Sequence, residues 1–108
     1  MNKYGNHKTV VGDKVFDSKA EAERYTELLI LQNMKVIEGL ECQKRYPLVK
    51  GRWKDGKPFR IEYIADFVYW QDGEVVVEDV KGYKTQEYIL KKKLMKAVYG
   101  IEIQEVKA

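Results

Sequence analysis

The sequence predicts an α/β domain in which two helices pack on a small mixed sheet. Two segments carry helix signals, three carry strand signals separated by tight turns, and a fourth strand follows the second helix. A strand reached through a helix usually lies parallel to its neighbour and returns by a right-handed crossover. The length of 108 residues is that of one domain, so we expect a single unit over residues 1–108.

The first helix is predicted from its N-terminal signal. Ser18 is a favourable N-cap, and Glu21 three positions later completes a capping box. The helix should then run to Asn33 or Met34, where a loop begins. Ahead of it we expect only a short strand at about residues 8–11, followed by a turn.

Three strands should follow, joined by hairpins. The Asp-Gly pairs at 55–56 and 72–73 are typical of tight hairpin turns. Pro47 has no N–H to donate within a sheet, so it favours an edge strand or a bulge. The three strands are expected over residues 43–49, 59–70 and 74–81.

A second helix and a last strand complete the predicted fold. Thr85 is a suitable N-cap for a helix over Gln86 to Tyr99, and Gly100 is a typical helix stop. Apolar and polar residues alternate over residues 101–106, which predicts the final strand.

Composition and rare residue types exclude several classes of protein. Hydrophobic residues make up 44% and charged residues 34%, as in soluble globular proteins. No apolar run approaches the roughly 18 residues of a membrane span, and the N-terminus lacks a signal peptide's apolar stretch, so we expect a cytoplasmic location and no membrane partner. Cys42 has no second cysteine, and His7 is the only histidine, which excludes internal disulfides and cysteine-cluster or histidine-metal sites.

Acidic residues stand at positions where apolar residues would be expected. Helical periodicity places Glu21 on the core-facing side with Leu28, although closing the capping box would explain it equally well. Asp66 lies in mid-strand, where burial without a partner costs roughly 2–7 kcal/mol even for neutral polar groups. A bulge, or an ion pair with Arg60 or Lys81, is the other explanation for Asp66.

The segment VVVEDVKG ends an apolar strand with charged residues. A period of two places Asp79 and Lys81 on one face of the strand and Glu78 on the other. Pairing through the second tight turn would bring Asp66 close to Asp79, where two carboxylates repel each other unless a divalent cation binds both. Lys81 could then reach a metal-bound water or a phosphate. Glu78 is the alternative ligand if the strand is bulged.

Lysines are concentrated just downstream of these acids. Six fall within the 16 residues 81–96, which contain one acidic residue, Glu87. An acidic cluster beside a basic helix suits a site that binds a metal cation and a phosphate backbone together, although lysine runs are more often solvated helix faces. The candidate backbone contacts are Lys84, Lys91, Lys92 and Lys93.

These acids and their order resemble the PD-(D/E)xK nuclease superfamily, whose restriction-endonuclease-like core has the element order αβββαβ. The pattern of that superfamily is an acid on the first helix, an aspartate on the second core strand and acid-x-lysine on the third. Glu21, Asp66, Asp79 and Lys81 match it, with Ala65 in place of the proline. The acid-x-lysine triplet occurs elsewhere in the chain, but only Asp79 to Lys81 follows a strand-borne acid at hairpin distance.

A narrower resemblance covers nearly the whole chain. FDSKAEAERY, YIADF and VEDVKG resemble a family of small phage-encoded proteins known only as a domain of unknown function. That family is similar to Holliday-junction resolvases and to the endonuclease subunit of Tn7-type transposases. Gln43 occupies a place where related nucleases keep a glutamine near the site.

The resemblance implies a Mg²⁺- or Mn²⁺-dependent DNA endonuclease in phage DNA metabolism, acting in the host cytoplasm. The metal ligands it implies are Asp66, Asp79 and Glu21. Lys81 would orient the attacking water and stabilise developing charge, with Gln43 and Glu78 in supporting positions. Structure-selective cleavage by a homodimer, as in junction resolution, follows by analogy.

Two other functions fit the same sequence. The first is a catalytically inactive relative that serves as a DNA-binding or protein-interaction module in phage replication or packaging. The second is a structural homo-oligomer that binds no nucleic acid. Because all four residues of the acid, acid and acid-x-lysine pattern are present, the endonuclease is the preferred hypothesis.

Overall fold

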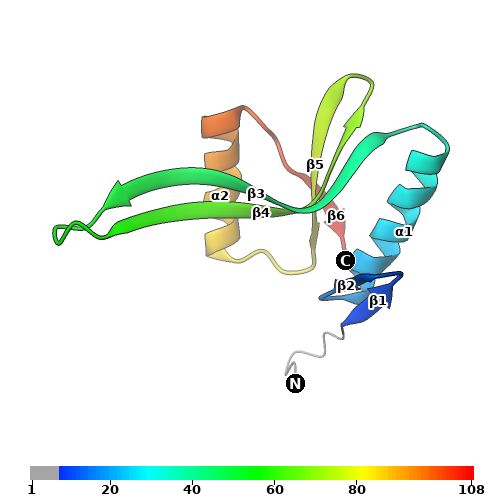
Figure 1. Cartoon of the computed structure of the whole chain (residues 1–108), viewed down its shortest axis with the longest axis horizontal. Helices are drawn as coiled ribbons and strands as arrows, with labels where there is room; N and C mark the ends of the chain where they lie inside the picture. The colour runs from blue at the N-terminus through cyan, green and yellow to red at the C-terminus, as the bar shows by residue number, and fades with distance from the viewer. Residues whose placement is uncertain (1–7) are drawn as a thin grey trace.

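The computed structural model describes residues 8–108 and contains two helices, a four-stranded mixed sheet and a separate two-stranded sheet (Figure 1). His7 lies outside the described residues. In chain order the elements are β1 (Thr9–Val11), β2 (Lys14–Phe16), α1 (Lys19–Asn33), β3 (Glu38–Arg52), β4 (Pro58–Gln71), β5 (Glu74–Lys81), α2 (Gln86–Tyr99) and β6 (Gln104–Lys107). After the small β1–β2 hairpin, the order is the predicted αβββαβ.

The large sheet has the strand order β3-β4-β5-β6. The first three strands are antiparallel, and β6 lies parallel to β5, as the helical connection predicts. Pro47 lies in the edge strand β3, next to a register shift between Pro47 and Val49. Both Asp72 and Gly73 have positive φ, which matches the tight turn expected between β4 and β5.

Local capping signals located both helices correctly. The hydroxyl of Ser18 accepts a hydrogen bond from the Glu21 N–H at 3.1 Å, and the hydroxyl of Thr85 accepts one from the Tyr88 N–H at 3.1 Å. Gly100 ends α2 in the left-handed conformation with φ 70°. Neither helix in residues 8–108 has the length and apolar character that crossing a membrane requires.

Three strand predictions differ from the structure. The second strand of the N-terminal hairpin, β2, was not expected, and β3 is longer at both ends than the predicted 43–49. The final strand is shorter than 101–106, because the Ile101 N–H bonds to the Met95 carbonyl at the end of α2 rather than to the sheet. Ile103 is buried in the core while the chain returns to the sheet.

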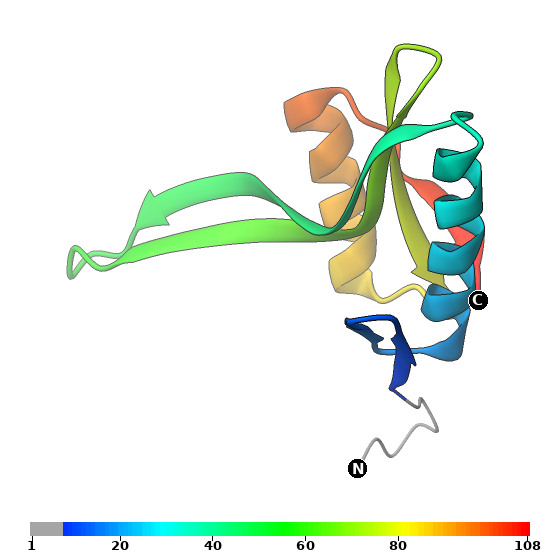
Figure 2. The ribbon, with the colours of Figure 1, turned by 45° about the vertical axis from the view of Figure 1, so that its right-hand side comes forward.

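The helices cover opposite faces of the sheet, so the domain has three layers (Figure 2). Under α1, Leu28 packs in a cluster with Phe67 of β4. Under α2, Met95 packs in a second cluster with Ala65 of β4 and Val77 of β5. The outer part of the β3–β4 hairpin is formed by residues 44–60, and we call it the arm. Its inner residues Tyr46 and Leu48 pack under α2, and its tip extends beyond both helices (Figure 1).

A buried ion pair attaches α1 to β5. Glu78 is only 2% exposed, and Arg24 binds both of its oxygens, with Nε 2.8 Å from Oε1 and Nη2 2.6 Å from Oε2. The Tyr69 hydroxyl also donates to Oε2. The bond to Glu78 raises the pKa of Arg24, against the opposing effect of burial, so the guanidinium stays charged.

Substitution Arg24→Ala should destabilise the protein by about 3–5 kcal/mol, because it leaves the Glu78 carboxylate buried without its cation. Urea denaturation of wild type and variant measures the difference. The matched control is Arg45→Ala, because Arg45 is 65% exposed and lies 3.9 Å from Glu62. Equal stability of the two variants would show that the buried pair does not hold α1 in place.

Candidate metal and phosphate site

The candidate site lies where β4 stops pairing with β5. The last pair of that ladder is Phe67 with Glu78, so Asp66 and Asp79 are the first residues beyond it. We call this position the divergence point. The Asp66 carboxylate accepts a hydrogen bond from the Val80 N–H at 2.8 Å. It therefore replaces the strand partner that β5 loses when β4 diverges.

Asp66 also marks an irregularity shared by two strands. Ala65 faces the α2 side of the sheet and Phe67 the α1 side, although regular alternation would put both on one face. On β3, Gln43 lies opposite Asp66 with φ 56°, a left-handed conformation that is uncommon outside glycine. Its amide donates to Asp66 at 3.4 Å. The irregularity thus presents Asp66 and Gln43 together.

Asp79 faces the α2 side, on the same face as Lys81, as the period of two predicts. It is 3% exposed and accepts a 2.6 Å hydrogen bond from the Tyr63 hydroxyl. The Lys81 ammonium lies 3.2 Å from the other Asp79 oxygen and 4.4 Å from the centre of the Tyr88 ring. A carboxylate and an aromatic face therefore hold this ammonium in place.

Glu21 joins the site from the first turn of α1. Its carboxyl pKa is raised to about 7, first by burial and then by the negative charge of Asp66, with smaller effects from Asp17 and Asp79. Lys81 acts in the opposite direction. The charges of Asp66, Asp79 and Lys81 all act on Glu21, so the helix-borne acid lies near the two strand-borne acids.

Repulsion within the cluster also affects Asp66. Burial and then the charge of Asp79 raise its pKa to about 6, while the Val80 N–H, Lys81 and Gln43 lower it. The donors around Asp66 therefore offset only part of the cost of its charge. A bound cation would remove the remaining repulsion.

Glu78 is separated from this cluster. It lies on the α1 face of β5 and is bound by Arg24 and Tyr69. Its predicted alternative role as a metal ligand is not supported by this position, and its contacts instead fix α1. The sequence did not identify three residues that contact or support the site: Tyr63, Tyr88 and Arg24. In the sequence, nothing distinguishes them from other tyrosines of the core or other arginines of a helix.

The four candidate lysines do not form one surface. Lys91 lines a cavity of about 240 Å³ together with Asp79 and Lys81. The other three line a separate cavity of about 550 Å³ beside β6: Lys84, Lys92 and Lys93. There, Glu105 pairs with Lys84 at 2.9 Å and Lys92 at 3.2 Å, and its pKa is lowered to about 2 by Lys84, Tyr88 and Lys92.

The chemistry of the donors suits a hard divalent cation, because Glu21, Asp66 and Asp79 all supply carboxylate oxygens. Across residues 8–108, no three His, Cys, Asp or Glu side chains are arranged so that they could hold a metal ion. Both oxygens of Asp79 already have partners in Tyr63 and Lys81. A metal would therefore compete with those contacts for Asp79.

Metal-free protein should lose stability as the pH rises from about 4 to about 7. Glu21 and Asp66 titrate at about 7 and about 6 when folded, against ordinary values of 4.5 and 3.8, so the folded state binds more protons in this range. Glu21→Gln should weaken the trend, measured as urea midpoints in EDTA. The exposed Glu23→Gln should keep the wild-type trend. Identical pH profiles for all three proteins would contradict the clustering of the acids.

Comparison with known proteins identifies the family of this chain but indicates no activity for it. No curated protein matches the chain significantly. A family model described as a protein of unknown function (DUF1064) matches residues 1–107. Since this match spans nearly the whole chain, the protein belongs to the DUF1064 family.

Proposed function

We propose that this protein is a divalent-metal-dependent endonuclease that hydrolyses DNA phosphodiester bonds. The observation that carries the proposal is that Asp66, Asp79 and Lys81 lie at the divergence point, with Glu21 near enough for their charges to act on it. Glu21 comes from α1, Asp66 from β4, and Asp79 with Lys81 from β5. An acidic cluster beside a fixed ammonium suits a metal ion and a phosphate together.

The order of elements supports the same proposal. The αβββαβ order, with β6 parallel to β5, agrees with the core that the resemblance to the PD-(D/E)xK superfamily implies. The matched acids also fall on the expected elements. Selective cleavage of branched DNA by a homodimer is the finer form of this proposal, and it rests on the resemblance alone.

In this proposal Asp66, Glu21 and one oxygen of Asp79 would hold Mg²⁺ or Mn²⁺. When bound, the metal would activate water and stabilise negative charge on the phosphate. Asp66 is held by Val80 and Gln43, so one ligand is oriented before the metal arrives. Lys81 supplies a positive charge at the phosphate and can orient the attacking water.

Lys91 lies in the same cavity as Asp79 and Lys81 and would contact the DNA backbone beside the scissile phosphate. Lys91 is paired with Glu87 at 3.0 Å, and Lys84 and Lys92 are paired with Glu105, so ion pairing does not distinguish these lysines. Lys91 is favoured by its position beside Asp79 and Lys81 alone.

A second candidate is a DNA-binding module that does not cut. The observation in its favour is that Asp79 is engaged on both oxygens, by Tyr63 and by Lys81, as a purely structural carboxylate would be. This candidate keeps the nucleic-acid partner and removes the metal.

Cleavage assays separate these candidates. Purified protein is incubated with supercoiled, linear and four-way-junction DNA in Mg²⁺ or Mn²⁺. Wild type should cut at least one form, and Asp66→Asn, Asp79→Asn and Lys81→Gln should each lose at least about a hundredfold in rate, the loss typical when transition-state stabilisation is removed.

The matched control is Asp72→Asn, because Asp72 is exposed in a turn and its φ of 52° is one that asparagine tolerates. It should cut like wild type, and EDTA should stop cleavage. Binding of DNA by wild type without cleavage of any form would favour the non-cutting module. Cleavage that survives Asp79→Asn would point to a contaminating nuclease.

A further inference from the structure

The arm is the most positively charged part of the chain. Within residues 44–60 only Asp55 is acidic, whereas the whole chain has a net charge of +3. The seven basic residues of the arm are Lys44, Arg45, Lys50, Arg52, Lys54, Lys57 and Arg60. The sequence-based candidates for DNA contact, all on or near α2, include none of these.

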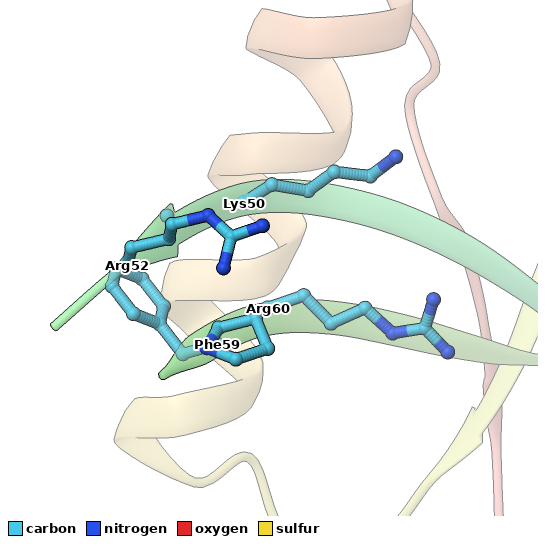
Figure 3. A pocket seen from close by; sticks show the side chains of 6 residues that line it. Lys50, Arg52, Phe59 and Arg60 are labelled. Carbon is cyan, nitrogen blue, oxygen red and sulfur yellow. The ribbon is translucent and has the colours of Figure 1, made fainter. Parts of the chain in front are cut away.

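Three arm cations gather around one cavity of about 650 Å³ (Figure 3). Lys50 lies directly opposite Arg60 in the β3–β4 ladder, and Arg52 lies on the same face one period further along β3. Figure 3 shows the Lys50 and Arg60 side chains extending in the same direction along the two strands. Like charges placed directly across a ladder destabilise it unless an anion lies between them.

Two of these cations have no carboxylate partner among residues 8–108. Arg52 donates to the Gly56 carbonyl at 2.9 Å, and Lys50 forms no ion pair within this part of the chain. Arg60 alone is paired, with its Nε 3.1 Å from Glu62. The charge of Lys50 and Arg52 is therefore open to an external anion.

Aromatic residues give the outer arm its own packing. A Cβ at Gly51 would collide with the Phe59 ring, so the absence of a side chain at Gly51 lets that ring lie across the strand. Trp53 packs on Phe59 with ring centres 5.0 Å apart and remains 63% exposed. The arm thus presents cations beside an exposed aromatic side chain, a combination typical of nucleic-acid contacts.

We infer that the arm is a second DNA-binding element, which binds the phosphate backbone away from the cleavage site. This inference rests on the proposed nuclease function. Arg60 is six residues along β4 from Asp66, which is roughly 20 Å of strand. At about 3.4 Å per nucleotide, the arm would contact phosphates about six base pairs from the scissile bond. The bound chemistry is the phosphodiester backbone, without base readout.

The variant Lys50→Gln/Arg52→Gln tests this inference, because it removes two unpaired cations and leaves no carboxylate without its partner. Binding of a labelled duplex in EDTA is measured by fluorescence anisotropy across a range of salt concentrations. The slope of log K against log salt should become shallower by about 1.8, since each phosphate contact contributes about 0.9.

The control Lys8→Gln/Lys35→Gln loses the same charge elsewhere, from exposed positions outside the arm and α2 that form no ion pair within residues 8–108. Its salt slope should equal that of wild type. Equal slopes for the arm variant and wild type, or an equal change in both double variants, would overturn the inference while leaving cleavage at the divergence point intact.

Two further outcomes separate the inference from the nuclease proposal. Arm-dependent binding without cleavage by any form of the protein would keep the inference and refute the proposed nuclease. Absence of salt-dependent DNA binding, with a dimer in sedimentation that the arm variant loses, would overturn the inference in favour of contact with a second copy of the chain.

Discussion

The buried ion pair between Arg24 and Glu78 is the interaction on which the position of the site depends. Burial makes an unpaired Glu78 costly, so α1 must lie where Arg24 reaches both carboxylate oxygens. Glu21 lies one helical turn before Arg24, and Asp79 follows Glu78 on β5. The same pair that docks the helix therefore sets the distance between the helix-borne acid and the strand-borne acid.

The divergence of β4 from β5 is the second constraint, and it links the acid cluster to the arm. Where the strands separate, Val80 loses a partner and Asp66 supplies one. The left-handed Gln43 allows β3 to follow the same bend. Beyond this point β3 and β4 continue as the arm. The acids and the basic arm are therefore consequences of one change in direction of the hairpin.

Local signals in the sequence predicted the order of elements, both helices and the exact span of β5, because caps and turns act over a few residues. The length of β3 could not be predicted, since its outer residues Lys50, Gly51 and Arg52 include no apolar side chain that would show alternation in the sequence. The orientation of Asp66 depends on Gln43, a partner 23 residues away. The lysines of α2 lie near one another in the sequence, but successive residues of a helix point about 100° apart, so Lys91 and Lys92 lie on different sides of α2. Lys92 pairs with Glu105 of β6, a partner that is distant in the sequence.

The proposed function requires that the acids at the divergence point bind one metal ion. Crystals grown with Mn²⁺ and measured at the manganese absorption edge test it most directly. We expect an anomalous peak within bonding distance of Asp66 and Asp79, with Asp79 released from Tyr63 or Lys81. Manganese bound only elsewhere, with Asp79 still held by both partners, would contradict it.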